Sequence, residues 1–432
     1  MYLKNWVMRS NYKQLGNYIE QFDIRNKDCN NSLELEAIKG ISSISKSFIK
    51  TKANLVGVSP GNYKVVEPKQ FGFNPNTARM GDKIPIALNS GRNNVLVSSI
   101  YPTFKIIDAN LLLPEYLMMW FRRPEFDRYA RFKSHGSARE IFDYSEMCEV
   151  ELPVPSIEKQ REIVKEYNTI VNRIKLNEKL NQKLEETAQA LYKHWFVDFE
   201  FPNENGQPYK SSGGKMVYNE ELDLDIPELW ESEAINSFCT ITSSKRIFEH
   251  EYVSEGVPFF RAGEIKQKKQ GVPIKDVLYI SESRYNEIVN KFGQPESGDI
   301  LLTAVGSLLG ESYLVQPEKF YFKDGNVVWF KDFNQINYNT FIYGYLQSNY
   351  FQELLDEIKI GSGQSAITIK GLGEKHVVKP KKDILNAYAI KGNLIFKQIA
   401  FRNKKNLLLH ELNQIILSRM SKMEALQSSK AL

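Results

Sequence analysis

A polar segment with helical periodicity occupies residues 155–196, near the centre of the 432-residue chain. No glycine interrupts it, and its only proline is its first residue. Its apolar positions recur at the three- and four-residue spacing of a helix with one apolar stripe. At about 1.5 Å per residue, the helix would measure roughly 60 Å, so we interpret it as a spacer whose stripe requires a partner. The stripe consists of Ile163, Tyr167, Ile170, Ile174, Leu180, Leu184, Leu191 and Trp195.

A second and weaker helical pattern covers the chain from about residue 383 onward. Polar residues 402–405 interrupt its stripe. Two stripes that are separated by a compact domain can satisfy each other by packing side by side. Because the first helix leads out to the second domain and the second helix leads back, we predict antiparallel pairing. The second stripe consists of Ile395, Ile399, Leu409, Leu412 and Ile416.

The remaining sequence predicts two mixed heads of the α/β class, or more strictly α+β heads. In the first head, turn signals separate short apolar stretches such as residues 94–101, and a helix over 114–131 restarts at Pro124. Residues 202–215 are rich in Gly, Pro, Asn and Ser, which predicts a linker or exposed loop. In the second head we predict strands over 257–261, 299–305 and 327–331, and a helix over 339–358.

An internal repeat relates the two halves of the chain. A shift of 225 residues places Tyr116 on Phe341 and Pro155 on Pro380, and near the N-terminus it places Leu35 on Phe260 and Ala37 on Ala262. The order of head and helix therefore occurs twice, which predicts two heads in pseudo-twofold repeat, separated by two long antiparallel, coiled-coil-like helices. We predict a first head over residues 1–152, a helical spacer over 153–200, a linker over 201–225, a second head over 226–380 and a second spacer over 381–432.

Composition adds modest constraints. The formal charge of +5 and the pI of about 8.7 permit nucleic-acid binding without requiring it. No apolar segment has the length of a signal peptide core or a membrane span, so we expect a cytoplasmic protein with no membrane partner. Cys29, Cys148 and Cys239 lie far apart without histidines at ligand spacing, which favours buried thiols over zinc or disulfides.

Motifs for catalysis are not found. Residues 73–76 lack the second proline and the aromatic residue of an amino-methyltransferase loop, and residues 306–312 have the wrong spacing for a phosphate-binding loop. The five histidines form no metal-binding pair, and no nucleophile elbow occurs. We therefore predict no catalytic, cofactor or metal site in this chain.

Two separate heads without catalytic motifs suggest recognition of an extended, nearly twofold target, and duplex DNA is such a target. Lysines would contact phosphates, and arginine or amide side chains would reach base edges. The alternative for each residue is a solvated surface position. The candidates are Arg25, Lys39, Lys46, Lys50, Lys52 and Arg79 in the first head and Lys245, Arg246, Arg261, Lys266, Lys268 and Lys269 in the second.

Several short motifs in a fixed order resemble the specificity (S) subunits of type I restriction-modification systems, the HsdS-like family. The second half departs from the pattern, because residues 377–380 lack the Pro-x-Pro and no glutamine heads the final helix. The motifs are QLGNYI at 14–19, KGIS at 39–42, FNP at 73–75, RMG at 79–81, GS at 136–137, LPVP at 152–155 with Gln160, LYKHWFVDF at 191–199 and GSGQ at 361–364.

The resemblance implies a DNA-reading subunit without catalysis of its own. Each head would be a target-recognition domain for one half of a split site, and the helices would dock two methyltransferase subunits. Those partners would bring S-adenosylmethionine, and restriction subunits would bring ATP and Mg. A rod of roughly 60 Å would keep the half-site centres within about two duplex turns. The alternatives are a protein-binding scaffold with a helical dimerisation rod, and an enzyme that acts alone.

Overall fold

The computed structural model describes residues 12–76, 83–135, 140–360 and 365–421. The chain divides into two compact units. The first unit takes its residues from Met1–Asn172 and Glu411–Leu432, and the second is Arg173–His410. Both boundaries fall inside long helices, so each head packs with its own share of both helices. Within the described ranges, no helix has the length and apolar character needed to cross a membrane.

The first unit contains a four-stranded antiparallel sheet of order β2-β9-β6-β7. The rings of Phe71 and Phe104 stack on it with centroids 4.8 Å apart, and Phe121 from the covering helix packs edge-on against both. The strands are β1 Tyr12–Gln14, β2 Ile19–Phe22, β3 Lys39–Ile41, β4 Phe48–Lys50, β5 Lys64–Val66, β6 Phe71–Phe73, β7 Ile86–Leu88, β8 Val95–Val97, β9 Thr103–Ile106 and β10 Glu151–Pro153, and the short helices are α1 Pro114–Phe121, α2 Pro124–Phe132 and α3 Tyr144–Cys148.

The second unit repeats this sheet as β14-β21-β18-β19 and adds a second one, β15-β17-β16-β20. Only the β16·β20 pairing is parallel among the strand pairs of the described residues, which makes both heads α+β. The strands are β11 Met216–Asn219, β12 Leu224–Pro227, β13 Glu231–Ala234, β14 Thr240–Ser243, β15 Tyr252–Val253, β16 Val257–Phe260, β17 Leu278–Ile280, β18 Ile300–Thr303, β19 Ser312–Leu314, β20 Tyr321–Phe322, β21 Val327–Lys331 and β22 His376–Lys379. The short helices are α5 Ala262–Gln270, α6 Glu282–Phe292, α7 Tyr338–Leu346, α8 Asn349–Ile358 and α9 Ile369–Gly373.

The repeat holds at the predicted shift from the helices of the heads onward. Toward the N-terminus the shift changes, because β2 begins at Ile19 and β14 at Thr240, which is a shift of 221. The predicted pairings of Leu35 with Phe260 and of Ala37 with Ala262 are therefore wrong. The starts related by 225 are Pro124 and Asn349 for α2 and α8, Tyr144 and Ile369 for α3 and α9, and Ile157 and Lys382 for the long helices α4 and α10.

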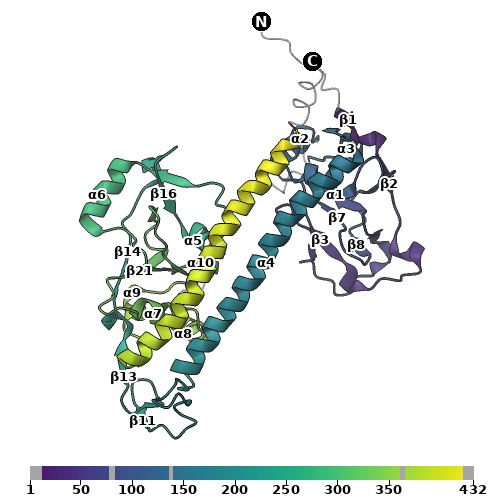
Figure 1. The fold of residues 1–432 in the computed structure, drawn as a ribbon. Coiled ribbons are helices and arrows are strands. Elements are labelled where there is room, and N and C mark those ends of the chain that lie inside the picture. Colours follow the sequence, from purple (N-terminus) through teal and green to yellow (C-terminus); the bar gives the residue numbers. More distant parts are fainter. Residues whose placement is uncertain (1–11, 77–82, 136–139, 361–364, 422–432) are drawn as a thin grey trace. The chain divides into compact units, whose positions relative to one another are not determined.

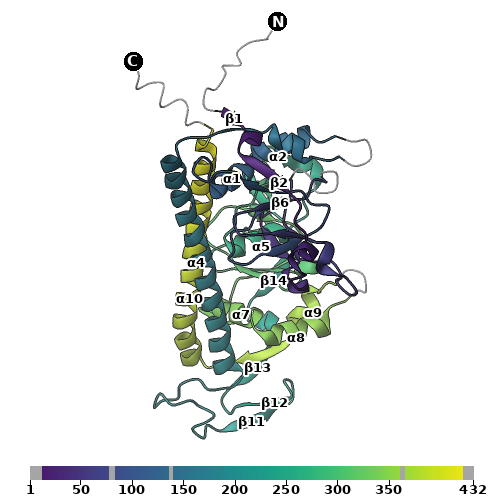
Figure 2. The same cartoon turned by 90° about the vertical axis from the view of Figure 1, so that its right-hand side faces the viewer.

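The long helices α4 Ile157–Phe196 and α10 Lys382–Arg419 run side by side (Figures 1 and 2). In the second unit, Asn177 bonds to Asn406 and Asn181 bonds to Asn403, each at 2.7 Å. Because the residue number rises along one helix while it falls along the other, the pairing there is antiparallel, as the connectivity predicted.

The buried seam differs from the predicted stripes at two positions. Leu180 and Leu412 are 40% and 45% exposed, so placing them in the seam was wrong. Next to Leu180 and Leu412 along the helices, the seam is occupied by asparagines. The prediction considered only apolar residues and therefore missed them. The seam positions that are buried include Ile163, Tyr167, Ile170, Ile174, Asn177, Asn181 and Trp195 on α4 and Asn406, Asn413 and Ile416 on α10. The predicted residues Leu184, Leu191, Ile395, Ile399 and Leu409 are half-buried.

The first turns of the two long helices are anchored in different ways. The Gln160 side chain is fully buried, accepts from the Leu113 amide and donates to the carbonyls of Leu111 and Pro155, all at 2.9 Å. Its equivalent in α10 is Leu385, which is buried in the aromatic core of the second unit. The missing glutamine at the start of the final helix therefore means that an apolar contact of Leu385 replaces the hydrogen bonds that Gln160 makes in α4.

Residues 202–215 form the predicted exposed loop, since most of them are exposed and no helix or strand is assigned there. The loop is held at Tyr209, whose ring stacks on Phe201 while Phe201 stacks on Trp230, at centroid distances of 4.7 and 4.8 Å. Three other predictions require correction. The helix predicted over 339–358 is two helices, because Ser348 caps α8 by accepting from the Phe351 amide. Helices α5 and α6 were not predicted. Of the three cysteines, Cys239 alone is fully buried.

Candidate nucleic-acid interface

Two lysines of the first head flank a hollow of about 350 Å³. Lys39 and Lys50 are direct partners across the β3–β4 hairpin, and Asn89 and Ser90 line the same hollow. Lys39 donates to the Glu36 carbonyl at 2.8 Å, while the Lys50 side chain is exposed. Ammonium, amide and hydroxyl groups in one hollow are the donor set that contacts phosphates and base edges.

Lys46, in the turn between β3 and β4, is buried. Its ammonium lies 2.6 Å from Asp127 Oδ1, donates to the Phe121 carbonyl at 2.6 Å and lies over the Phe126 ring. Burial lowers the pKa of Lys46, and Asp127 opposes that shift. Because Lys46 is 4% exposed and its ammonium is bonded inside the head, these contacts argue against the predicted contact of Lys46 with DNA and indicate that it stabilises the turn.

The other candidates of the first head lie in its loops. Arg25 is half-buried, with its Nε 3.4 Å from Asp23 Oδ1. Lys52 is exposed just beyond β4. Arg79 falls outside the residues that the structure describes, as do the motif residues 136–137 and 361–364.

Lys245 and Arg246 follow the first strand of the main sheet in the second head. Lys245 is exposed, with its ammonium 4.3 Å from the centre of the Phe292 ring, and Arg246 pairs with Asp324 at 3.0 Å. At the strand shift of 221, Arg246 corresponds to Arg25. Both heads therefore carry an arginine at the equivalent place, beside an aspartate that comes from a different segment in each head. The uniform shift of 225 concealed this relation.

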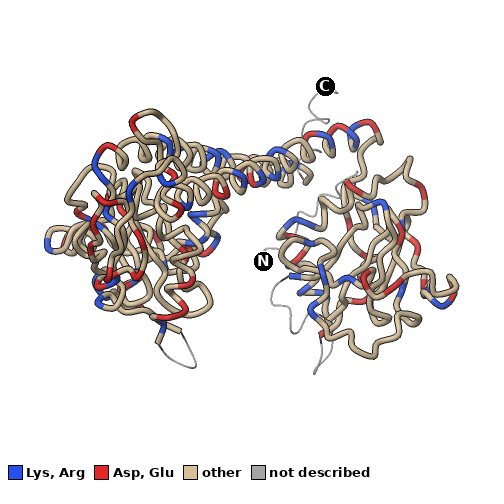
Figure 3. Tube along the Cα trace, turned by 90° about the horizontal axis from the view of Figure 1, so that it is seen from below, with Lys and Arg blue, Asp and Glu red and all other residues tan. Residues whose placement is uncertain are grey.

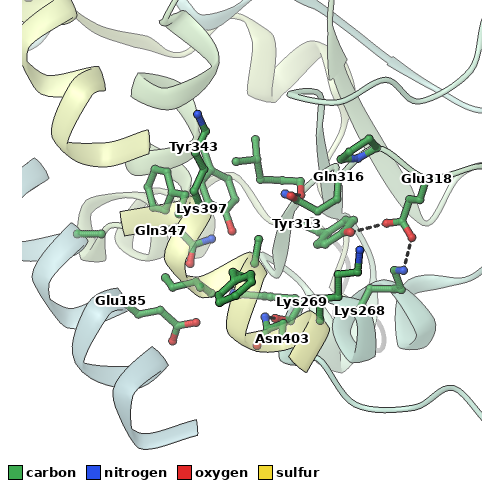
Figure 4. Close-up of a pocket in the computed structure, with 18 of the residues that line it drawn as sticks. Glu185, Lys268, Lys269, Tyr313, Gln316, Glu318, Tyr343, Gln347, Lys397 and Asn403 are labelled. Atoms are coloured by element: carbon green, nitrogen blue, oxygen red, sulfur yellow. Dashed lines mark hydrogen bonds and ion pairs between the residues drawn. The ribbon is translucent and has the colours of Figure 1, made fainter. Parts of the chain in front are cut away.

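The three neighbouring lysines among the DNA-binding candidates of the second head, Lys266, Lys268 and Lys269, are on helix α5. Lys266 and Lys269 pair with Glu311 at 2.8 and 3.0 Å, and Lys268 pairs with Glu318. These pairs bind α5 to the segment around β19, and Figure 4 shows the pair of Lys268 with Glu318. The positive charge of the three lysines is thus offset inside the head, and they are weak candidates for phosphate contacts.

Arg261 caps the N-terminus of α5. Its amide donates to Glu264 at 2.9 Å and its guanidinium also bonds to Glu264, yet 47% of the side chain is exposed. Figure 3 shows the wider pattern, in which Lys and Arg alternate with Asp and Glu over both heads. No group of three or more His, Cys, Asp or Glu residues suited to a metal ion occurs in the described part of the chain.

An exposed apolar row on α10 was not predicted. Ile390, Leu394, Phe401 and Leu408 are 74, 63, 55 and 58% exposed. Their spacings of four and seven residues place them on one face of the helix. An exposed apolar helix face is typical of a protein-binding surface. The signal was present in the sequence as a second heptad-spaced row beside the seam.

Comparisons with known proteins agree with this architecture. Residues 227–407 match the family described as the type I restriction modification DNA specificity domain. The MjaIX specificity subunit of Methanocaldococcus jannaschii is 26% identical over 340 residues, which is 78% of this chain and 72% of the relative. The HindI specificity subunit of Haemophilus influenzae is 30% identical over 126 residues, 28% of this chain and 27% of the relative.

A solved structure extends the likeness in fold to nearly the whole chain. The S subunit of a type I restriction-modification system from M. genitalium aligns over 97% of this chain and 98% of its own, with a TM-score of 0.54 and 14% identity. The family match covers the second head, and the archaeal relative spans most of both chains. By these comparisons the chain is similar to the specificity subunits of type I restriction-modification systems, the family that its motifs resemble.

Proposed function

We propose that this chain is the DNA-reading subunit of a type I restriction-modification complex, in which each head reads one half of a split target. The observation that carries the proposal is the duplicated sheet with an equivalent arginine, Arg25 or Arg246, beside an aspartate in each head. Two copies of one reading surface suit a target with two separate halves.

Affinity would come from the unpaired, exposed lysines, and sequence choice from neighbouring amide and guanidinium groups. Lys50 and Lys52 in the first head and Lys245 in the second are exposed and suited to phosphates. Asn89 and Arg246 carry side chains that recognise base edges by paired hydrogen bonds.

We further propose that the row of Ile390, Leu394, Phe401 and Leu408 is a docking surface for the methyltransferase subunits, two to each complex. An apolar helix face that enters a groove of a partner is a common mode of protein recognition. S-adenosylmethionine would then act on the methyltransferase subunits, and ATP and Mg on restriction subunits, while this chain supplies no catalytic group. We infer that the complex works in the cytoplasm, where it reaches chromosomal DNA.

The decisive experiment is to co-express the chain with the methyltransferase subunits of its host and to sequence the methylated DNA. We expect one split motif, with a fixed gap, that disappears when this chain is omitted. Methylation without a motif, or a continuous motif, would overturn the proposal.

The exposed apolar row also favours a second candidate, a protein-binding scaffold without DNA recognition. Salt distinguishes the two functions, because neutralised phosphates make DNA binding fall steeply with ionic strength, whereas an apolar protein contact does not weaken in this way. Binding of duplex DNA by the assembled complex should therefore be measured from low to high salt.

A further inference from the structure

Two asparagine pairs fix the register of the long helices in the second unit. Asn177, Asn181 and Asn406 are 5, 7 and 1% exposed, so each amide depends on a partner inside the seam. The partners are supplied across the seam, from Asn177 to Asn406 and from Asn181 to Asn403. A slide by one turn could re-form at most one pair, Asn181 with Asn406 or Asn177 with Asn403, and would leave the other amides unpaired, which is costly for those that are buried. A single buried asparagine is known to fix register in this way.

Asn403 makes a second hydrogen bond that leaves the helix pair. Its Oδ1 accepts from Asn181, and its Nδ2 donates to the carbonyl of Lys269 at 2.7 Å. Lys269 lies in the last turn of α5, so this one side chain joins α4, α10 and the second head (Figure 4).

The backbone of the head touches α10 at the same point. Gly271, the C-terminal cap of α5, has a φ of +64°, and a Cβ built on it would lie 2.6 Å from the Cβ of Asn403. A side chain at this position would be strained in conformation and would clash with α10. The glycine therefore allows the contact through which Asn403 reaches the head.

Beside this contact the packing of α10 on the head is interrupted, whereas nearer the start of α10 the ring of Phe396 packs edge-on against Tyr343 and Tyr388 lies in the aromatic core. A cavity of about 480 Å³ lies between the β19 side of the head and α10, and its lining includes Tyr313, Pro317, Phe396 and Lys397. Since side chains do not fill this space, packing does not fix the α5 side of the head there. The hydrogen bond of Asn403 and the close approach of Gly271 supply a contact that fixes this side.

Helix α5 connects this contact to the reading surface. It is nine residues long, roughly 13 Å at 1.5 Å per residue, and ends at the exposed Arg261 as its N-terminal cap. The pairs of Lys266 and Lys269 with Glu311, and of Lys268 with Glu318, fasten α5 to the rest of the head. A displacement at its C-terminus is therefore passed on to Arg261 and to the sheet.

We propose that Asn403 is a positioning residue that fixes the α5 side of the second head on the paired helices, while the aromatic core holds the rest of the head, and thereby helps to set the gap at which the second half-site is read. The inference rests on the proposed function, since it specifies how the reading head is held. It assigns to Asn403 no contact with DNA.

The test uses Asn403→Asp in the full chain, co-expressed with its methyltransferase subunits. The substitution removes the donor to the Lys269 carbonyl and keeps an oxygen that can accept from Asn181. We expect the preference for the native gap over gaps changed by one base pair to fall about fivefold, the usual worth of one hydrogen bond, with both half-site sequences unchanged. Sequencing of methylated DNA measures this ratio.

The matched control is Asn177→Asp, which makes the same chemical change in the seam without a contact to the head. It should lower the melting temperature comparably and leave the gap preference unchanged. Equal gap preferences in the two variants, or altered half-sites, would overturn the proposal. If Asn403→Asp does not accumulate as folded protein, Asn403→Ser provides the same comparison without a charge. Failure of the proposed function is distinguishable, because the wild-type complex would then methylate no split motif.

Discussion

The two heads share one sheet order but use their positive charge differently. The first head buries Lys46 against Asp127, whereas the second keeps Lys266, Lys268 and Lys269 in pairs with two glutamates at the surface of α5. In both heads, part of the positive charge visible in the sequence stabilises the fold. Only lysines and arginines that are not engaged in such internal pairs are available to bind DNA.

The largest expected effect concerns the buried pair of the first head. Lys46→Ala leaves the Asp127 carboxylate without its partner, and we expect the free energy of opening of this head to fall by about 3–5 kcal/mol. Native-state hydrogen exchange of the β6 and β9 amides measures it. Lys50→Ala, an exposed lysine of the same hairpin, is the control and should change it by less than about 0.5 kcal/mol. A similar loss in the free energy of opening for both variants would contradict the prediction that the buried pair of Lys46 stabilises the head more than an exposed lysine does.

A reciprocal exchange tests the equivalence of the two helix starts. Gln160→Leu would leave the Leu113 amide and the Leu111 carbonyl unpaired, and Leu385→Gln would bury an amide among aromatic rings. Each change should cost about 1–3 kcal/mol, measured by chemical unfolding. Leu385→Met, which conserves volume and polarity, is the control and should cost less than about 1.5 kcal/mol. If either exchange left the free energy of unfolding unchanged, the residue at that position would not be specific to its own head.

The smallest effect concerns free and paired lysines. Lys50→Ala and Lys52→Ala should each reduce the slope of log affinity against log salt by about 1, because each removes one phosphate contact. Lys266→Ala and Lys268→Ala should leave the slope unchanged, since glutamates already offset these charges. Fluorescence anisotropy of a labelled target duplex with the assembled complex gives all four slopes. An equal reduction in all four would refute the distinction between free and paired cations.

The elements that the sequence predicted well are those set by local periodicity. Helix α4, the restart at Pro124 and strand β21 follow from spacing, proline and β-branched residues, and the repeat follows from comparing the two halves. The asparagines of the seam were missed because their burial depends on a partner 222 or 229 positions away. The pairing of the α5 lysines was missed for the same reason, since Glu311 and Glu318 approach them only in the folded head.

The position of the unit boundary within the long helices decides how the second head could be produced as a fragment. Its aromatic core includes Tyr192, Trp195 and Phe196 of α4 together with Phe341 and Tyr388. A fragment beginning at residue 226 would lack the first three and present the other two to water. A fragment that keeps residues 173–410 retains the whole core. Exchange of specificity between related chains would therefore succeed best with crossover points inside the long helices rather than at the edges of the heads.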